Sequence, residues 1–305
     1  MWRESMARGR SGLRADNAAE HVNRSKPPET ASQRNASMTG NSTGGPLPGR
    51  LQIERSEFEG WPVHTVRPAT GDARGHVLYL HGGGYVSPLQ PAHWDLIARL
   101  AARTGRAFVV PDFPLAPGHT HHDVFPTLRR LYDQLSDGTD PDTFAVMGDS
   151  TGATMGLALV QSLPPGQRRP RDLVLMSPWL DATLTNPEIR ALEPHDPISS
   201  TENLSRFARW WAGRADVATP LLSPINGPLE NLGRVAIFAG TNDILTPDAR
   251  RLAQLAAEAT GTEMTLHEYP DMIHAFMLLR PGAETDAVLA EITRRLDADP
   301  GAVER

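Results

Sequence analysis

The chain lacks cysteine altogether, and it has no long apolar run. Without cysteine the protein can have no disulfide, no thiol nucleophile, no iron–sulfur cluster and no cysteine-ligated zinc. None of its runs reaches the ~18 apolar residues of a membrane-spanning helix, and the first residues lack the apolar core of a signal peptide. These absences predict a globular protein that does not span a membrane and is located in the cytoplasm.

Basic residues are not in excess either. The formal net charge is −6, which argues against nucleic acid as a partner. The first fifty residues carry eight basic and four acidic side chains, whereas the remainder carries 22 basic and 32 acidic ones. That first segment is rich in small polar residues and cannot bury enough apolar surface to offset its ordering entropy. We therefore predict a disordered arm over residues 1–48 and a folded domain over 49–305. A basic arm that contacts an anionic surface is the alternative.

Strand-like runs alternate with helical periodicity from residue 51 onward. The predicted strands are 51–54, 63–67, 76–80, 107–110, 143–147, 173–176, 235–239 and 264–269, and the predicted helices are 93–103, 124–135, 151–163, 248–259 and 284–296. Thr246, followed by Pro247, is predicted to be the N-cap of a helix. Alternation of this kind indicates an α/β fold with a mostly parallel sheet and helices on both faces. The first strands have no helix between them, so they should form an antiparallel edge.

One segment, at about 178–233, interrupts the alternation. It is too long for a simple connection, which predicts an inserted helical lid. Phe207, Trp210 and Trp211 have helical i, i+3, i+4 spacing, so they form either a buried stripe of a helix over 201–212 or the lining of a pocket. We expect one tryptophan to anchor the lid and the other to border the pocket.

The first chemical motif is Gly148-Asp149-Ser150-Thr151-Gly152, between a predicted strand and a predicted helix. A nucleophile elbow needs this arrangement, because small residues on either side let a sharp turn hold the serine at a helix N-terminus. Negative charge is favoured there. The alternative is a plain glycine-rich turn with a serine N-cap, and Asp149 is interpreted as a turn residue.

The second motif is His81-Gly82-Gly83-Gly84-Tyr85, directly after a predicted strand. Successive glycines allow backbone N–H groups to point into a cleft, where they can stabilise an oxyanion. A flexible turn is the alternative. No phosphate-cradling glycine motif is present, so we predict no nucleotide cofactor. His119, His121 and His122 raise the question of a metal, but a solvated proline-rich loop is the preferred interpretation, and no cofactor or metal is predicted.

The third signal is a pair of candidate partners for Ser150. Asp243 and His274 each follow a predicted strand, so the three residues occur in the chain order that α/β-hydrolases use. The carboxyl ends of parallel strands face one crevice. There His274 would take the serine proton and Asp243 would orient the imidazole. Asp271 is a rival to Asp243, although it lies on the same turn as His274.

Together, HGGGY, GDSTG, the D-I-L-T-P segment that begins at Asp243, and I-H-A-F around His274 resemble the hormone-sensitive-lipase-like group of α/β-hydrolases, which includes bacterial carboxylesterases. The resemblance extends from about residue 51 to 296. It implies Ser150 as the nucleophile, Asp243 as the acid and His274 as the base. It also implies an oxyanion hole formed by the N–H groups of Gly83, Gly84 and Thr151, with His81, Gly82, Gly148 and Gly152 as supporting motif residues.

The resemblance implies a serine carboxylic-ester hydrolase that acts on short- to medium-chain acyl esters through an acyl-enzyme, without a cofactor. The alternatives are an amidase or lactone hydrolase with the same triad, or a non-catalytic ligand-binding receptor on this fold. The expected partners are a small-molecule ester and a second copy in a homodimer, the latter as a state to be tested. Two departures from the family pattern are Thr151, where alanine is usual, and the segment from Phe113 to Gly118, which replaces Y-R-L-A-P-E.

Overall fold

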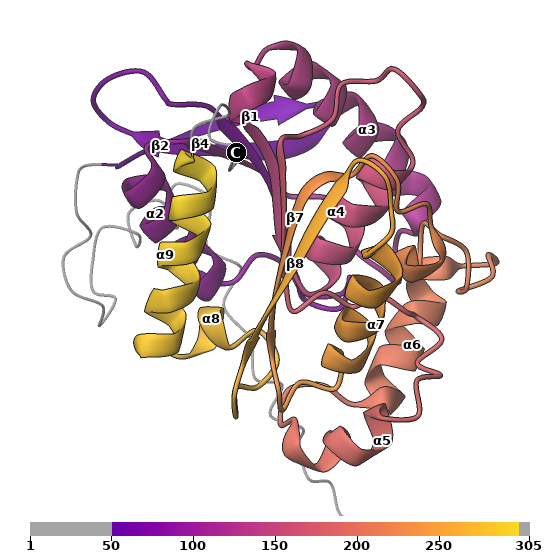
Figure 1. Ribbon diagram of the computed structural model, residues 1–305. Coiled ribbons are helices and arrows are strands. Elements are labelled where there is room, and N and C mark those ends of the chain that lie inside the picture. The colour runs from indigo at the N-terminus through magenta and orange to yellow at the C-terminus, as the bar shows by residue number, and fades with distance from the viewer. Residues whose placement is uncertain (1–50, 299–305) are drawn as a thin grey trace, which may run out of the picture. The chain divides into compact units, whose positions relative to one another are not determined.

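The computed structural model describes residues 51–298, which form an eight-stranded sheet with helices on both faces (Figure 1). The strand order is β1-β2-β4-β3-β5-β6-β7-β8. The strands are β1 (Leu51–Phe58), β2 (Trp61–Pro68), β3 (His76–Leu80), β4 (Ala107–Pro111), β5 (Phe144–Asp149), β6 (Asp172–Met176), β7 (Gly233–Gly240) and β8 (Thr262–Tyr269). The pairs β1–β2 and β2–β4 are antiparallel, and all other pairs are parallel. The predicted α/β class and its antiparallel edge are confirmed. The predicted arm lies outside the described residues.

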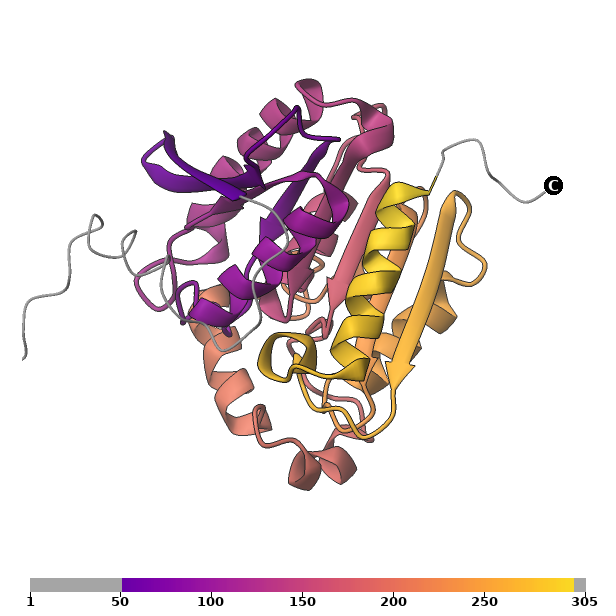
Figure 2. The same ribbon diagram turned by 90° about the vertical axis from the view of Figure 1, so that its left-hand side faces the viewer.

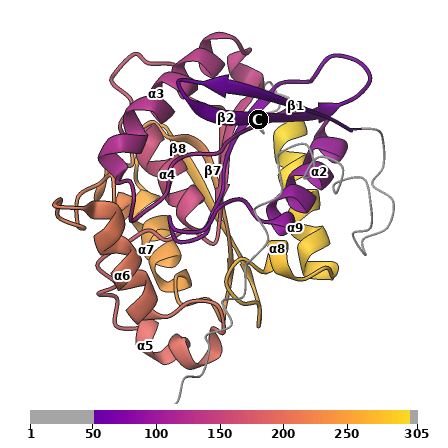
Figure 3. The same cartoon turned by 180° about the vertical axis from the view of Figure 1, so that it is seen from behind.

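The helices are α2 (Pro91–Thr104), α3 (His121–Asp137), α4 (Thr151–Gln161), α5 (Ile189–Leu192), α6 (Thr201–Ala212), α7 (Thr246–Ala256), α8 (Phe276–Leu279) and α9 (Ala283–Asp297). Alternate residues of each strand point to opposite faces of a sheet. On β3, Leu78 and Leu80 therefore join one apolar core with α3, α4 and α7, while Val77 and Tyr79 join another with α2, α8 and α9. Figure 2 shows the side covered by α2 and α9, and Figure 3 shows the molecule from behind.

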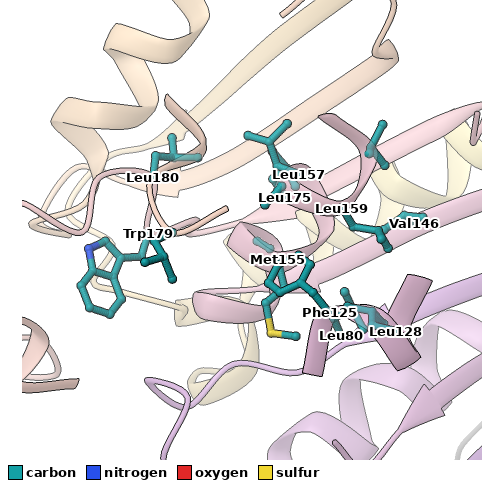
Figure 4. Packing of buried hydrophobic residues seen from close by; sticks show 14 of the residues in the cluster. Leu80, Phe125, Leu128, Val146, Met155, Leu157, Leu159, Leu175, Trp179 and Leu180 are labelled. Carbon is teal, nitrogen blue, oxygen red and sulfur yellow. The ribbon is translucent and has the colours of Figure 1, made fainter. Parts of the chain in front are cut away.

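The core beside the first motif is densely apolar. All eleven residues of α4 are buried. Met155 of α4 lies among Leu80, Phe125 and Trp179 in the close-up of this core (Figure 4). Truncating a buried leucine or methionine in such surroundings costs about 2–5 kcal/mol of unfolding free energy. The element that carries the serine motif is thus held by packing on every side.

The predicted insertion contains α5, α6 and two short 3₁₀ turns, η2 (Glu193–His195) and η3 (Pro224–Asn226), between β6 and β7. The helix expected over 201–212 is observed with those bounds as α6. In Figure 2, α5 and α6 lie at the end of the sheet toward which the arrow of β8 points. That end carries the chemical motifs. Within residues 51–298, no helix has both the length and the apolar composition needed to cross a membrane.

Two predictions about where helices begin are wrong. His121 and His122 are not in a solvated loop but begin α3, because Thr120 and Asp123 form a capping box one turn earlier than expected. His121 is only 2% exposed and its Nδ1 lies 3.1 Å from the carbonyl oxygen of Trp211. Thr246 is not an N-cap but the first residue of α7, and its hydroxyl donates to the Gly240 carbonyl at 2.6 Å.

Candidate active site

Ser150 occupies a strained turn between β5 and α4. Its backbone has φ +50° and ψ −120°, a conformation that a residue with a side chain rarely adopts and that is typical of a nucleophile elbow. The flanking glycines are sterically required: a Cβ on Gly152 would overlap the Leu80 carbonyl, and one on Gly148 would overlap the Gly152 backbone. The Ser150 N–H donates to the Met176 carbonyl at 2.8 Å, which ties the turn to β6.

Two further predicted residues, His274 and Asp243, form a chain of contacts that begins at Ser150. The Nε2 atom of His274 lies 2.9 Å from Ser150 Oγ, and its Nδ1 lies 2.9 Å from Oδ2 of Asp243. A carboxylate oxygen accepts hydrogen bonds, so Nδ1 carries the proton and Nε2 is free to accept the serine proton. Asp243 is fully buried, and its other oxygen accepts from the Leu245 N–H at 2.9 Å. The contact chain therefore runs from hydroxyl to imidazole to carboxylate.

Asp271, the rival carboxylate, does not join this chain. It is exposed, and within residues 51–298 it makes hydrogen bonds through its backbone. Its N–H donates to Thr241 Oγ1 at 2.8 Å, and its carbonyl accepts from the Asn242 side chain at 3.3 Å. The geometry brings Asp243, not Asp271, to His274.

Charge around His274 determines its protonation. Burial alone would lower the pKa of His274, but the nearby carboxylates of Asp243, Asp196 and Asp149 outweigh burial and raise that pKa above its ordinary value. The imidazolium form is thereby stabilised. A base that must hold a proton during a reaction benefits from this shift.

The glycine loop after β3 lies directly above the elbow. A Cβ on Gly82 would collide with the Asp149 carboxylate and approach Ser150 Cβ to 2.9 Å. Gly83 and Gly84 have φ +113° and +65°, so the left-handed backbone explains why glycine stands there. Within residues 51–298 no acceptor is recorded for the N–H of Gly83 or Gly84. Thr151 begins α4, where an N–H has no partner within the helix. Three donors thus remain available near Ser150.

The sequence-based interpretation of Asp149 as a turn residue is wrong. Asp149 is 2% exposed and ends β5. Its Oδ1 accepts a 2.7 Å hydrogen bond from the Tyr79 hydroxyl, and its Oδ2 lies 3.4 Å from Nε2 of His93. The Nδ1 of His93 accepts from the Gln90 N–H at 2.9 Å, so Nε2 carries the proton that faces Asp149. The sequence offered one signal of this role: Asp149 ends an otherwise apolar run. A charge buried there needs hydrogen-bonding partners.

His81 joins the glycine loop to Phe113. Its ring stacks on Phe113 with centroids 4.3 Å apart and planes within 11°. Its Nδ1–H donates to the Gly82 carbonyl at 2.7 Å. Phe113 is the first residue of the segment that departs from the family pattern, and the stack shows what its aromatic ring does. The other departure, Thr151, is 1% exposed.

Residues 77–278 match the sequence profile of the alpha/beta hydrolase fold family. The chain belongs to that family. This α/β-hydrolase is 32% identical over 221 residues to an acetyl-hydrolase of Streptomyces hygroscopicus, covering 71% of this chain and 72% of the relative. It is 30% identical over 230 residues to an esterase of Acinetobacter venetianus, with 73% and 76% covered.

Solved structures agree with the sequence relatives. An esterase from the bacterial hormone-sensitive lipase family superimposes with a TM-score of 0.76 at 27% identity, covering 89% of this chain and 92% of that one. The resemblance inferred from HGGGY and GDSTG is therefore confirmed. This α/β-hydrolase is an enzyme, a carboxylic-ester hydrolase of the hormone-sensitive-lipase-like group.

Proposed function

We propose that this enzyme is a serine esterase that cleaves short- to medium-chain acyl esters through a covalent intermediate on Ser150. The observation that carries the proposal is the pair of 2.9 Å contacts from Ser150 Oγ through His274 to Asp243. A base within hydrogen-bond reach of a hydroxyl, oriented by a third group, is the arrangement that activates a serine nucleophile.

The proposed reaction has two halves. Ser150 Oγ attacks the ester carbonyl while His274 Nε2 takes its proton, and the alcohol leaves with that proton as the acyl-enzyme forms. Water then attacks the acyl carbonyl, His274 accepts a proton from it, and the carboxylic acid departs as Ser150 regains its hydrogen. Asp243 holds the imidazole and stabilises its charged form throughout both halves.

The N–H groups of Gly83, Gly84 and Thr151 are the proposed oxyanion hole. Their availability supports the assignment, since donors already bonded to protein oxygens could not turn to a substrate oxygen. Each donor of this kind contributes about 3–4 kcal/mol to the transition state.

Residues 178–233 are proposed to cover the site as a lid. Two contacts support this. Phe207 of α6 lies so close to the glycine loop that a Cβ on Gly84 would be 2.8 Å from its ring, and Trp211 stacks on Tyr85. A bulky ring against the proposed oxyanion loop favours small acyl groups. The similarity to an acetyl-hydrolase points in the same direction.

A panel of p-nitrophenyl esters from acetate to palmitate tests the proposal. We expect the highest kcat/KM among acetate, butyrate and octanoate, and a loss of about 10⁴-fold or more in Ser150→Ala. A p-nitroanilide and a lactone series, assayed in parallel, distinguishes the amidase and lactone hydrolase alternatives. Ester turnover by Ser150→Ala close to that of the unaltered enzyme would refute the mechanism.

Three expectations about partners and location remain predictions from the sequence. They are a homodimer, no nucleic-acid partner and a cytoplasmic location. Light scattering on the purified chain tests the first of these. Retention on a nucleic-acid column and cell fractionation test the other two.

A further inference from the structure

A buried carboxylate of the insertion, that of Asp196, contacts the loop that carries Asp243. Asp196 follows the 3₁₀ turn η2 and is 6% exposed. Its Oδ2 accepts a 3.2 Å hydrogen bond from the N–H of Ile244, the residue next to Asp243. Within residues 51–298, this bond joins the insertion to the backbone of the loop that carries Asp243.

The remaining bonds of Asp196 fix its orientation. Its Oδ1 accepts from the N–H groups of Ile198 at 2.9 Å and Ser199 at 3.0 Å. Three backbone donors thus converge on the two oxygens, which satisfies a buried carboxylate without any cation. The side chain cannot rotate without breaking at least one of these bonds, so the position of its charge is defined.

That charge acts on His274 although the two side chains are not hydrogen-bonded. Burial lowers the pKa of His274, while Asp243 from the loop after β7, Asp196 from the insertion and Asp149 at the end of β5 raise it. Asp243 also bonds the ring directly. Asp196 therefore supplies negative charge from an element separate from the sheet.

We propose that Asp196 is a positioning residue of this esterase, which fastens the loop that carries Asp243 to the insertion and so holds Asp243 against His274. The proposal rests on the triad proposed above. Its physical content is twofold: one bond that orients the acid-bearing loop, and one charge that favours the imidazolium. A merely structural residue would supply the first without the second.

Asp196→Asn tests this, because asparagine keeps the size of the side chain but removes the charge and leaves one donor without its acceptor. The free energy of a hydrogen bond to a charged group corresponds to a factor of about ten or more in an equilibrium constant. If the Asp243 loop loses that much of its orientation, we expect kcat/KM at pH 7 to fall by about tenfold. The midpoint of the acidic limb of kcat/KM should move down by about half a pH unit.

Asp216→Asn is the matched control. Asp216 lies on the same insertion, is exposed, and likewise accepts a bond from a backbone N–H two residues on, that of Ala218, at 3.0 Å. We expect its kcat/KM and pH profile to equal those of the unaltered enzyme. Should Asp196→Asn fold poorly, Asp196→Glu retains the charge, and its midpoint should stay near the original while kcat falls through misplacement.

The outcomes separate this proposal from the proposed function. An Asp196→Asn enzyme that melts at a lower temperature but keeps the original acidic midpoint would overturn the role of Asp196 alone. A His274→Ala enzyme that retains activity and an acidic limb would instead overturn the triad. Labelling of Ser150 by a fluorophosphonate across the same pH range gives an independent readout of the base, since it does not depend on ester binding.

Discussion

Tyr85 and Trp211 stack nearly face to face, with ring centroids 4.6 Å apart and planes within 4°. Tyr85 ends the glycine-rich motif, and Trp211 lies on α6 of the insertion. Both rings are buried, at 4% and 1% exposure. The stack therefore joins the loop proposed to hold the oxyanion to the segment proposed to cover it.

Trp211→Ala should destabilise the fold by about 3–5 kcal/mol, because a fully buried ring is removed from a packed contact. Trp210 is 39% exposed and its ring lies near the Arg206 guanidinium, so Trp210→Ala should change the unfolding free energy by less than about 1 kcal/mol. Denaturant melts of the two variants check this. Equal losses in both would show that the stack does not anchor the insertion.

Phe207→Ala should shift the preferred ester length upward. Removing the ring that lies against Gly84 opens space beside the proposed oxyanion loop, so the ratio of kcat/KM for octanoate to that for acetate should rise by about tenfold. Trp210→Ala, on the same helix, is the control and should leave the ratio unchanged. An unaltered profile in Phe207→Ala would mean that α6 does not shape the acyl site.

The acidic limb of kcat/KM should have its midpoint above the ordinary histidine value of about 6.5, because the pKa of His274 is raised and the base must be neutral to react. Asp243→Asn should lower this midpoint and reduce kcat by about 10⁴-fold. His274→Ala should be more damaging still. If Asp271→Asn is crippling and Asp243→Asn is harmless, the acid is misassigned.

The same raised pKa links His274 to stability. A histidine whose pKa is higher in the folded than in the unfolded chain stabilises the fold fully below the unfolded value of about 6.5. That contribution is lost as the pH rises through the folded pKa. His274→Gln should therefore flatten the dependence of the melting temperature on pH across this window, and an unchanged slope would contradict the linkage.

Tyr79→Phe should destabilise the enzyme by about 1.5–3 kcal/mol, since it removes a hydrogen bond to a buried carboxylate. Burial raises the pKa of Asp149, but His93 and Tyr79 outweigh burial and leave it below its usual value. This stabilisation is present above the unfolded pKa and is lost as the pH falls through the folded pKa. The deficit of Tyr79→Phe, followed by urea melts, should accordingly shrink at low pH, and a deficit independent of pH would argue against the charged acceptor.

The order of strands and helices, and the proximity of the three residues proposed as the triad, could be predicted because each follows from local sequence. Ser150, Asp243 and His274 all stand just after apolar runs, and the topology of a parallel sheet then brings such positions together. The roles implied for them by the family resemblance agree with the distances observed. The glycines on either side of Ser150 predict the sharp turn there.

What could not be predicted depends on contacts between residues distant along the chain. Asp149 is hydrogen-bonded to Tyr79, which is 70 residues away in the sequence. The periodicity of the sequence does not predict this pair.

The sequence could not tell which of two adjacent tryptophans anchors the insertion: Trp211 is buried, whereas Trp210 is 39% exposed, and it stays a prediction that one of them borders the cleft. Phe207 is the ring that approaches the glycine loop. The apolar stripe of α6 determines its inward face, on which Leu204, Ala208 and Trp211 are buried, but the stacking of Trp211 on Tyr85 joins residues distant along the chain.

The insertion meets the body at Gly84 and Tyr85 through α6 and at Ile244 through Asp196. Replacing this segment would therefore change the contacts at the glycine loop and at the acid-bearing loop together. A chimeric enzyme with the insertion of a relative would have different side chains against the glycine loop and a different contact at the Asp243 loop. Its acyl preference and the pKa of its catalytic histidine would therefore change together. Diversification of acyl preference in this lineage should consequently be correlated with drift in the pH at which each enzyme works.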